Sequence, residues 1–173
     1  TETGQILWSG SIAEGANSGA LVNNGIVYVN AYTQENPYPT NLYAFNASGC
    51  GNSSCQPIWI APSGNASGNL IPAPAVINNI VYVGSYSNGA VMYAYDTITG
   101  EILWKWENSS SAGGFNSSTT IANNIIYSAT TDGNVYAFNA SGCNNLICNP
   151  LWTYNMGNGI VTSSSPAVTN GII

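Results

Sequence analysis

Four cysteines are the side chains in this 173-residue sequence whose type and spacing are best suited to chemistry. They form two pairs, Cys50 with Cys55 and Cys143 with Cys148, and four residues separate the members of each pair. Four convergent thiolates could bind zinc, whereas two thiols in one short loop can form a disulfide. The pairs lie 93 residues apart in loops that a sequence repeat makes equivalent, and the chain has no histidine. We therefore predict two local disulfides rather than a zinc site, which implies an oxidising compartment.

Acid–base and nucleophilic catalysis have few candidate residues. The one lysine is Lys105, between Trp104 and Trp106; it could make a cation–π contact, although we favour a solvated lysine at a strand end. A glycosidase-like pair needs two carboxylates about 5–10 Å apart across a cleft, and the spacing favours no such pair. The acidic residues are Glu2, Glu14, Glu35, Asp96, Glu101, Glu107 and Asp132. We expect no catalytic site, no cofactor and no metal site.

The chain carries very little charge. Charged residues make up 5% of the sequence and the formal net charge is −6, whereas about 25% of residues are charged in an ordinary globular protein. A single cation gives no electrostatic basis for binding nucleic acid or an anionic membrane surface, and we exclude both. No apolar run approaches the roughly 18 residues of a membrane span. Because few groups titrate, we expect little loss of stability in acid.

Asn-x-Ser sequons are spread along the chain. They begin at Asn46, Asn52, Asn65, Asn108, Asn116 and Asn139. All fall at expected strand ends or in loops, where a glycan can project without disturbing packing. Some sequons arise by chance in a sequence rich in Asn and Ser, but together they predict a glycosylated protein outside the cytoplasm.

A repeat fixes where these residues lie. The segment 41–50 (NLYAFNASGC) returns at 134–143 with nine of ten residues identical, and 1–8 (TETGQILW) returns at 97–104 as TITGEILW. The tryptophans of the repeat follow each other at intervals of 51, 45 and 48 residues: Trp8, Trp59, Trp104 and Trp152. A fixed period of this kind predicts stacked supersecondary units.

Each unit predicts four short antiparallel strands. Runs rich in Val, Ile and Tyr, such as Ile26–Val29 and Ile80–Val83, alternate with Asn-Gly or Asp-Gly turns, which accept the positive φ of tight hairpins. No stretch has the spacing of an amphipathic helix. The predicted fold is all-β, a β-propeller of four-stranded blades of about 47 residues. The expected boundaries are a last strand at 1–8, blades at 9–60, 61–107 and 108–155, and a partial blade at 156–173. About four blades would then be present, one of them split between the two ends of the chain.

The recurring Tyr-Ala-Phe-Asn, Thr-x-Thr-Gly-x-Ile-Leu-Trp and Ser-Pro-Ala-Val-x-Asn-Gly-Ile-Ile segments resemble the repeats of pyrroloquinoline-quinone-type (PQQ-like) β-propellers. The resemblance covers essentially the whole chain. It implies that the tryptophan of each blade packs as a wedge against the next, which assigns inter-blade packing to Trp8, Trp59, Trp104 and Trp152.

The same resemblance says little about function, because such propellers serve quinoprotein dehydrogenases, a lipoprotein of the bacterial outer-membrane assembly machinery and many surface proteins. The dehydrogenases carry a disulfide between adjacent cysteines over the quinone, a calcium ion, an aspartate base and a nearby cation. This chain has no Cys-Cys dipeptide and no arginine, so we expect no quinone in this segment.

The repeat leaves one blade incomplete. Aligning the two halves places Ile173 against Val81 and Thr1 against Thr97, so counterparts of Tyr82–Asp96 are missing. Three arrangements remain open: a segment of a longer propeller, a four-bladed ring that closes imperfectly, and an open blade completed by strands of a neighbouring chain. We favour an open array over a closed ring. Unpaired strand edges with apolar faces recruit partner strands, and head-to-tail pairing that does not close produces filaments.

The expected function is non-catalytic. We expect a secreted or cell-surface propeller with a structural or adhesive role, which assembles into an extracellular filament or surface layer by strand pairing between subunits. The alternatives are a scaffold segment of a PQQ-dependent quinoprotein dehydrogenase and a protein-binding platform similar to the outer-membrane assembly lipoprotein. The expected partners are copies of the chain or other surface proteins at open blade edges. The expected location is extracellular or at the cell surface, with the periplasm as the alternative.

Overall fold

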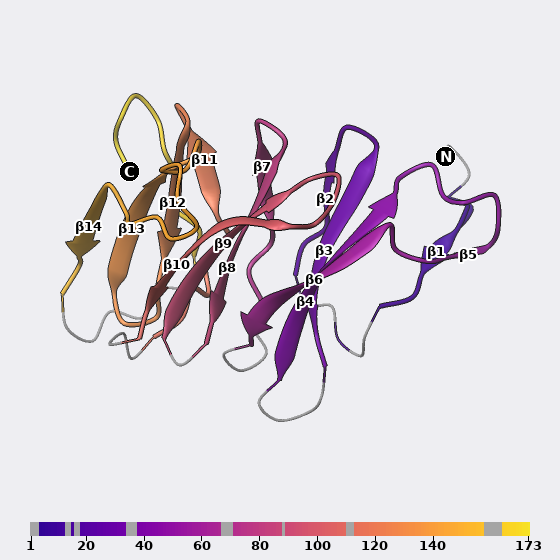
Figure 1. Ribbon diagram of the computed structural model, residues 1–173, viewed down its shortest axis with the longest axis horizontal. Coiled ribbons are helices and arrows are strands. Elements are labelled where there is room, and N and C mark those ends of the chain that lie inside the picture. The colour runs from indigo at the N-terminus through magenta and orange to yellow at the C-terminus, as the bar shows by residue number, and fades with distance from the viewer. Residues whose placement is uncertain are drawn as a thin grey trace.

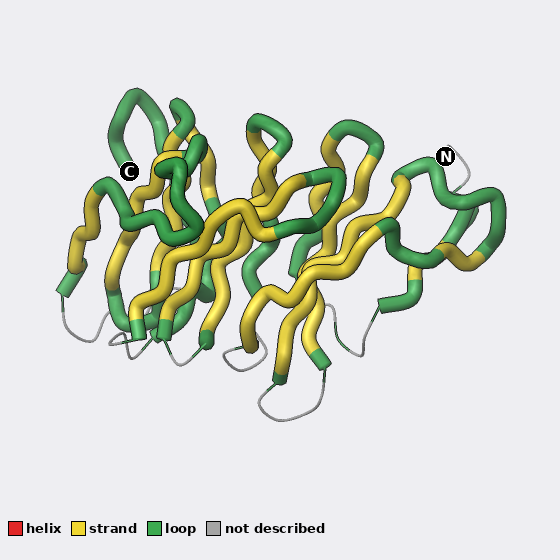
Figure 2. The backbone as a smooth tube through the Cα atoms, viewed as in Figure 1, coloured by secondary structure: helices red, strands yellow, loops and turns green. Residues whose placement is uncertain are grey.

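The computed structural model describes residues 4–12, 15, 18–33, 38–66, 71–87, 89–109, 113–157 and 164–173. These residues form strands, turns and loops and contain no helix, as Figure 2 shows. Across the described part of the chain, therefore, no apolar helix has the length to cross a membrane. The prediction of an all-β fold is confirmed.

An eight-stranded sheet and a four-stranded sheet follow one another along the chain. They divide into three four-stranded antiparallel units, which we name blades A, B and C. Blade A is formed by β2 (Leu21–Asn23), β3 (Ile26–Tyr32), β4 (Pro39–Asn46) and β6 (Trp59–Asn65). Blade B is formed by β7 (Ala75–Ile77), β8 (Ile80–Tyr86), β9 (Ala90–Asp96) and β10 (Ile102–Asn108). Blade C is formed by β11 (Thr120–Ala122), β12 (Ile125–Ala129), β13 (Asn134–Asn139) and β14 (Trp152–Asn155).

The blades stand side by side with the two ends of the chain at opposite ends of the row, as Figure 1 shows. A single bridge between Asn65 and Tyr86 links blades A and B. Two further short strands, β1 (Ser9–Gly10) and β5 (Ser54–Cys55), pair in parallel outside the blades. The sheets do not close into a ring, so the described residues form part of a propeller.

Asparagine turns connect the first two strands of each blade. Asn24 and Gly25 have φ of 48° and 76°, and the Asn78–Asn79 pair has φ of 52° and 61°. Glycine adopts positive φ readily because it has no Cβ to clash with the following carbonyl oxygen. Asparagine tolerates this conformation because its short polar side chain can form a local hydrogen bond. These turns reverse the chain with the twist that antiparallel strands need, as the sequence predicted.

The core lies between blades, so the middle strands are buried on both faces. In β8, Val81 and Val83 pack in a cluster with blade A residues, whereas Tyr82 packs in a cluster with blade C residues. Successive side chains of a strand point to opposite faces. A strand between two neighbouring blades is therefore apolar on both faces, which explains the apolar run Ile80–Val83 at the start of β8.

Expected boundaries differ from the structure at two places. The sequence placed a last strand at 1–8, but residues 4–8 form no strand and β1 begins at Ser9. The sequence placed the end of the first blade at residue 60, but β6 continues from Trp59 to Asn65 and pairs with β4 as far as Pro39. The tryptophan begins this outer strand instead of ending it. The described part of the expected partial blade, residues 164–173, contains one bridge, between Thr169 and Ile172, and no named strand.

Candidate docking surface between blades

Trp59 marks the contact between blades A and B. Its indole is 9% exposed, and its N–H donates a hydrogen bond to the carbonyl of Thr97 at 3.1 Å. The hydroxyl of Tyr28, from β3, donates to the same carbonyl at 3.3 Å, and the two rings lie 5.9 Å apart. Two donors of one blade therefore converge on one acceptor of the next, which fixes the position of the blades.

A glycine lies under the indole. Gly100 has a φ of +73°, and a Cβ built on it would lie 2.7 Å from two ring carbons of Trp59. Real Cβ atoms do not approach other atoms so closely, and L-residues with a side chain rarely adopt this φ. Glycine is therefore required here both by the backbone conformation and by the approach of the ring.

The same arrangement recurs between blades B and C. Trp104 is 3% exposed and packs on Gly142, whose φ is +75°. Tyr82 donates a hydrogen bond to the carbonyl of Ala140, the counterpart of the Thr97 carbonyl. The indole N–H of Trp104 is buried and has no acceptor among the residues that the structure describes. We call each such contact of an indole with a glycine of the next unit a dock, and that glycine a docking glycine. In the dock between blades B and C, the tyrosine is the hydrogen-bond donor.

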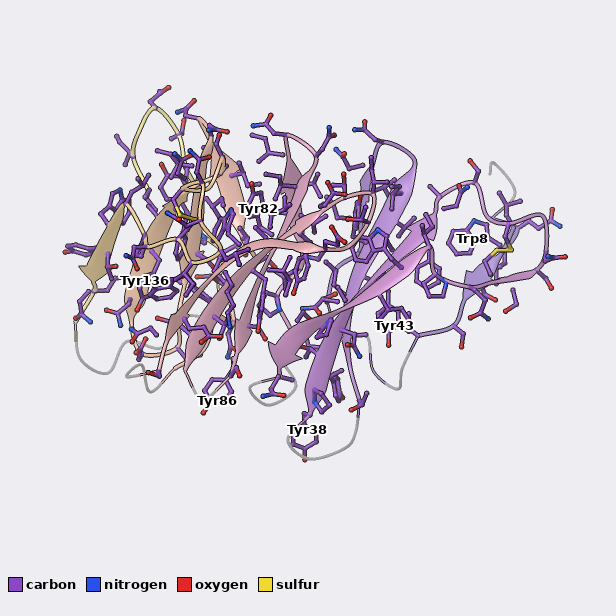
Figure 3. The ribbon with its side chains drawn as sticks, viewed as in Figure 1. Trp8, Tyr38, Tyr43, Tyr82, Tyr86 and Tyr136 are labelled. Carbon is purple, nitrogen blue, oxygen red and sulfur yellow. A yellow bond between two sulfur atoms is a disulfide. The ribbon has the colours of Figure 1, made fainter. Side chains whose placement is uncertain are left out.

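Trp8 repeats the arrangement at the other end of the row. Its indole N–H donates to the carbonyl of Ala47 at 3.2 Å, and its ring lies against Gly49, whose φ is +78°. Trp8 lies beside the disulfide of the neighbouring loop, as Figure 3 shows. The segment that carries Trp8 therefore occupies, on blade A, the position that a preceding blade would occupy.

The two cysteine pairs are disulfides, Cys50–Cys55 and Cys143–Cys148. Each closes a loop that we name clasp loop A (50–55) and clasp loop C (143–148). Clasp loop C reaches back to blade B, where Lys105 N–H donates to the Leu146 carbonyl at 2.8 Å and Cys148 N–H donates to the Lys105 carbonyl at 3.0 Å.

Clasp loop A makes the same parallel pairing with the segment after Trp8. Ser9 N–H donates to the Ser53 carbonyl at 2.9 Å, and β1 pairs with β5. Each clasp loop thus adds a short strand to the outer strand of the preceding unit.

Blade B has a short turn in place of a clasp loop. In this turn, Asp96 Oδ1 accepts hydrogen bonds from the N–H groups of Thr99 and Ile98. These bonds to the charged form lower the pKa of Asp96.

Blade C exposes the face that is covered in blades A and B. Trp152 is 40% exposed, although it corresponds to Trp59 and Trp104 and lies beside Tyr127 with ring centroids 6.0 Å apart. Tyr154, two residues along β14, is 64% exposed. A hollow of about 500 Å³ lies here. It is lined by Val135, Trp152, Thr153, Tyr154, Met156 and Ile173. The three glycines that pack under the other indoles, Gly49, Gly100 and Gly142, lie against Trp8, Trp59 and Trp104, and none of them lies against Trp152. We name this surface the open face.

A family model described as outer membrane protein assembly factor BamB matches residues 51–173. The chain belongs to this PQQ-like repeat family. BamB from Moraxella catarrhalis is similar in structure, with a TM-score of 0.61 and 16% identity over 90% of this chain and 44% of BamB. A europium-containing methanol dehydrogenase has a TM-score of 0.66 and 16% identity, over 87% of this chain and 27% of its own. No match was found among curated protein sequences.

The computationally designed Ika4 protein has a TM-score of 0.60 and 18% identity, over 96% of this chain and 89% of its own. At these identities the likeness shows a common fold and no more. The PQQ-like repeat chain spans less than half the length of BamB and about a quarter of the methanol dehydrogenase. The expected repeat family and propeller architecture are confirmed.

The remaining predicted residues of this PQQ-like chain do not converge on one site. Lys105 pairs with Glu107, with Nζ and Oε1 2.6 Å apart, and this ion pair raises the lysine pKa. Sequence analysis had considered an indole contact or a solvated lysine and had missed this neighbour. Among the described residues, no three or more His, Cys, Asp or Glu side chains lie together as metal ligands. Three of the acidic residues, Glu2, Glu14 and Glu35, lie outside the described residues.

The sequons differ in their surroundings. Asn46, Asn52 and Asn139 are exposed, and Asn65, Asn108 and Asn116 are partly buried. Asn52 lies in clasp loop A, whereas the side-chain oxygen of Asn116 is buried. Asn108 donates from its amide nitrogen to the Tyr136 hydroxyl at 3.3 Å. Access to a glycosyltransferase is therefore unequal among the six predicted positions.

Several tyrosine hydroxyls have a pKa above the usual value. Burial raises the pKa of these residues, which we name the core tyrosines: Tyr28, Tyr82, Tyr95 and Tyr136. Burial disfavours the charged phenolate because the interior solvates it poorly. The core tyrosines stay neutral at physiological pH. Tyr28, Tyr82 and Tyr95 donate hydrogen bonds between blades, whereas the Tyr136 hydroxyl accepts one from Asn108.

The docking glycines were missed by sequence analysis, which had singled out the tryptophans alone. A signal was available, because a Ser-Gly or Thr-Gly dipeptide ends each turn before the tryptophan-bearing strand: Thr3-Gly4, Ser48-Gly49, Thr99-Gly100 and Ser141-Gly142. A glycine that recurs at one place in every unit indicates a required backbone conformation or close approach.

Proposed function

We propose that this chain is a non-catalytic propeller segment with a structural or adhesive role outside the cytoplasm. In this role it associates with further copies of itself, into a filament or surface layer, through the open face of blade C. The observation that carries the proposal is the contrast between Trp152, 40% exposed, and its counterparts Trp59 and Trp104, 9% and 3% exposed. A tryptophan that is buried in each internal dock is available on the open face for an external partner.

The edge of β14 supports the same proposal. Soluble proteins protect exposed edge strands with lysine, proline, bulges or covering loops. The outer strand β6 contains Pro62, and β10 contains Lys105 and is covered by clasp loop C. The sequence of β14, Trp-Thr-Tyr-Asn, has none of these protections. Of the three outer strands described, β14 is therefore the one most open to strand pairing with another chain.

Charge and cysteine chemistry support the compartment. A chain with 5% charged residues and a net charge of −6 opposes self-association only weakly at physiological salt. Disulfides persist in oxidising compartments and are rare in the cytosol. Two disulfides in a BamB-like fold favour a periplasmic or extracellular location, of which we propose the cell surface or the extracellular space.

Analytical ultracentrifugation over a wide concentration range, together with negative-stain microscopy, tests the proposal. We expect species larger than one chain that grow with concentration. Tyr154→Ser should weaken this association, because Tyr154 contributes apolar area to the open face. Ile98→Ser is the matched control, because Ile98 is 71% exposed but lies in the turn of blade B, away from the open face. Discrete single-chain particles at every concentration would refute self-association.

A second candidate function is a protein-binding platform that uses the same open face for an unrelated chain. The membership of the BamB-like family favours it. Affinity capture from the native source, with Tyr154→Ser as the negative bait, distinguishes the two. A second copy of the chain supports self-association, and one reproducible foreign partner lost with Tyr154→Ser supports the platform.

A further inference from the structure

Two parts of an inter-blade dock are present in this chain without being paired with each other. None of the docking glycines Gly49, Gly100 and Gly142 lies against the ring of Trp152. Gly4 has the φ of a docking glycine, +66°, and a Cβ built on it would meet no atom within 4 Å. The three glycines that carry an indole, Gly49, Gly100 and Gly142, have φ between +73° and +78°.

The repeat identifies what Gly4 corresponds to. The segment Thr1–Trp8 matches Thr97–Trp104, so Gly4 takes the place of Gly100 and Trp8 takes the place of Trp104. In the complete dock, Gly100 receives the indole of Trp59 from the preceding blade. Trp59 and Trp152 both begin the last strand of a blade and both lie beside a tyrosine of the second strand, Tyr28 or Tyr127. By this correspondence, Gly4 fits an indole placed as Trp152 is.

The two parts lie too far apart to meet within one chain. Gly4 belongs to the segment at the N-terminal end of the row, beyond blade A, and Trp152 belongs to β14 at the C-terminal end, as Figure 1 shows. Blades A and B and the first three strands of blade C lie between them. A contact between Gly4 and Trp152 would therefore join two copies of the chain.

We propose that Trp152 of one copy packs on Gly4 of a second copy, so that the open face of blade C is covered by the N-terminal segment of the next chain. This inference rests on the self-association proposed above and specifies its contact. Residues 4–8 supply the counterparts of residues 100–104, which include the turn glycine of the dock.

The N-terminal segment is already held in the orientation that this contact needs. Trp8 is fixed on blade A through Gly49 and the Ala47 carbonyl, while Gly4, four residues before it, has open space above it. A second copy that docks on Gly4 therefore continues the sequence of docks in the same direction. The contact joins two different surfaces, so it is heterologous and leaves a free Gly4 and a free Trp152 at the ends of each assembly.

Gly4→Ala tests the contact, and a control variant with a similar positive φ matches its backbone strain. In the docks within the chain, a Cβ on the glycine would lie 2.7–2.9 Å from the indole, so alanine should weaken association at least tenfold. Gly25→Ala is the matched control, because Gly25 has a φ of +76° and open space for a Cβ but lies in the turn between β2 and β3. It should associate as the wild type does. Trp152→Ala removes the other half of the contact and should also weaken association at least tenfold.

Mixing the two defective variants gives the decisive measurement. Gly4→Ala keeps Trp152, and Trp152→Ala keeps Gly4, so an equal mixture should form one-to-one dimers that neither variant forms alone. Analytical ultracentrifugation resolves these species, and circular dichroism verifies the fold of each variant. If the wild type associates but Gly4→Ala associates equally, or the mixture forms no dimer, the contact is overturned while self-association stands. A wild type that remains a single chain overturns both.

Discussion

Replacing Gly100 with alanine tests the inter-blade dock as a source of stability. An L-residue in the left-handed region costs about 1–2 kcal/mol relative to glycine, and Gly100 has a φ of +73°. The new Cβ would also lie 2.7 Å from the Trp59 ring. Displacing a well-packed buried side chain typically costs about 1–3 kcal/mol. We therefore expect Gly100→Ala to lower the free energy of unfolding by about 2–5 kcal/mol, a large part of the 5–15 kcal/mol typical of a folded domain.

The control separates the two contributions. Gly25→Ala carries the same backbone penalty, because Gly25 has a φ of +76°, but its Cβ would meet no atom within 4 Å. Only the first 1–2 kcal/mol should be lost in this variant. The difference between the variants, about 1–3 kcal/mol, then measures the contact with Trp59.

Equilibrium unfolding in urea, followed by tryptophan fluorescence and by circular dichroism, provides the free energies. Thermal melts should show a corresponding difference, since 1 kcal/mol shifts the midpoint by about 2–4 °C in a chain of this size. An equal loss in Gly100→Ala and Gly25→Ala would refute the reasoning, because the close approach of glycine and indole would then contribute nothing to stability.

Three further predictions follow from the same contacts. Replacing both cysteines of clasp loop C with serine should lower the free energy of unfolding by about 2 kcal/mol. The same change in clasp loop A should cost less, because loop C pairs with a complete blade and loop A pairs only with the segment after Trp8. Urea unfolding of both variants checks this, and an equal loss would contradict it. The free energy of unfolding should be nearly constant from pH 5 to 9 and fall above pH 10. The core tyrosines have folded-state pKa values above their unfolded value of 10, so the stability they contribute is lost as pH rises toward the folded values. Unfolding midpoints across this range measure the effect, and a flat profile to pH 12 would count against buried phenols. Mass spectrometry of glycopeptides from the native source should find a glycan on Asn52 and none on Asn116, and a modified Asn116 would show that its surroundings open to the transferase.

The elements that local chemistry specifies were predictable from the sequence. The Asn-Gly and Asn-Asn turns impose a positive φ on two adjacent residues, and the β-branched runs beside them favour extended backbone. Four residues between two cysteines are enough for a turn that brings the sulfurs together. These features depend on neighbours within a few positions, so the repeat, the strands and the disulfide loops could all be inferred. The sequence placed the end of the first blade at residue 60. Proline and glycine are uncommon within strands, so Pro62 and Gly64 hide the continuation of β6, which pairs with β4 as far as Asn65.

The contacts between units required the tertiary structure. The run Ile80–Val83 does not reveal that Val81 and Val83 face blade A while Tyr82 faces blade C, since both faces are apolar. The pairing of the clasp loops with the preceding unit, and the placement of each glycine under an indole, join residues about 40 positions apart.

The sequence by itself determined the four-stranded repeat unit, the turns, the cysteine pairs and the period of the tryptophans. Each of these is set by the intrinsic preferences of a few adjacent residues. The tertiary structure decided that Trp59 and Trp104 are covered, that Trp152 is not, and that Gly4 has open space. Equivalent tryptophans in similar repeats differ in exposure because different elements pack beside them. Which elements pack there depends on the position of each unit in the row.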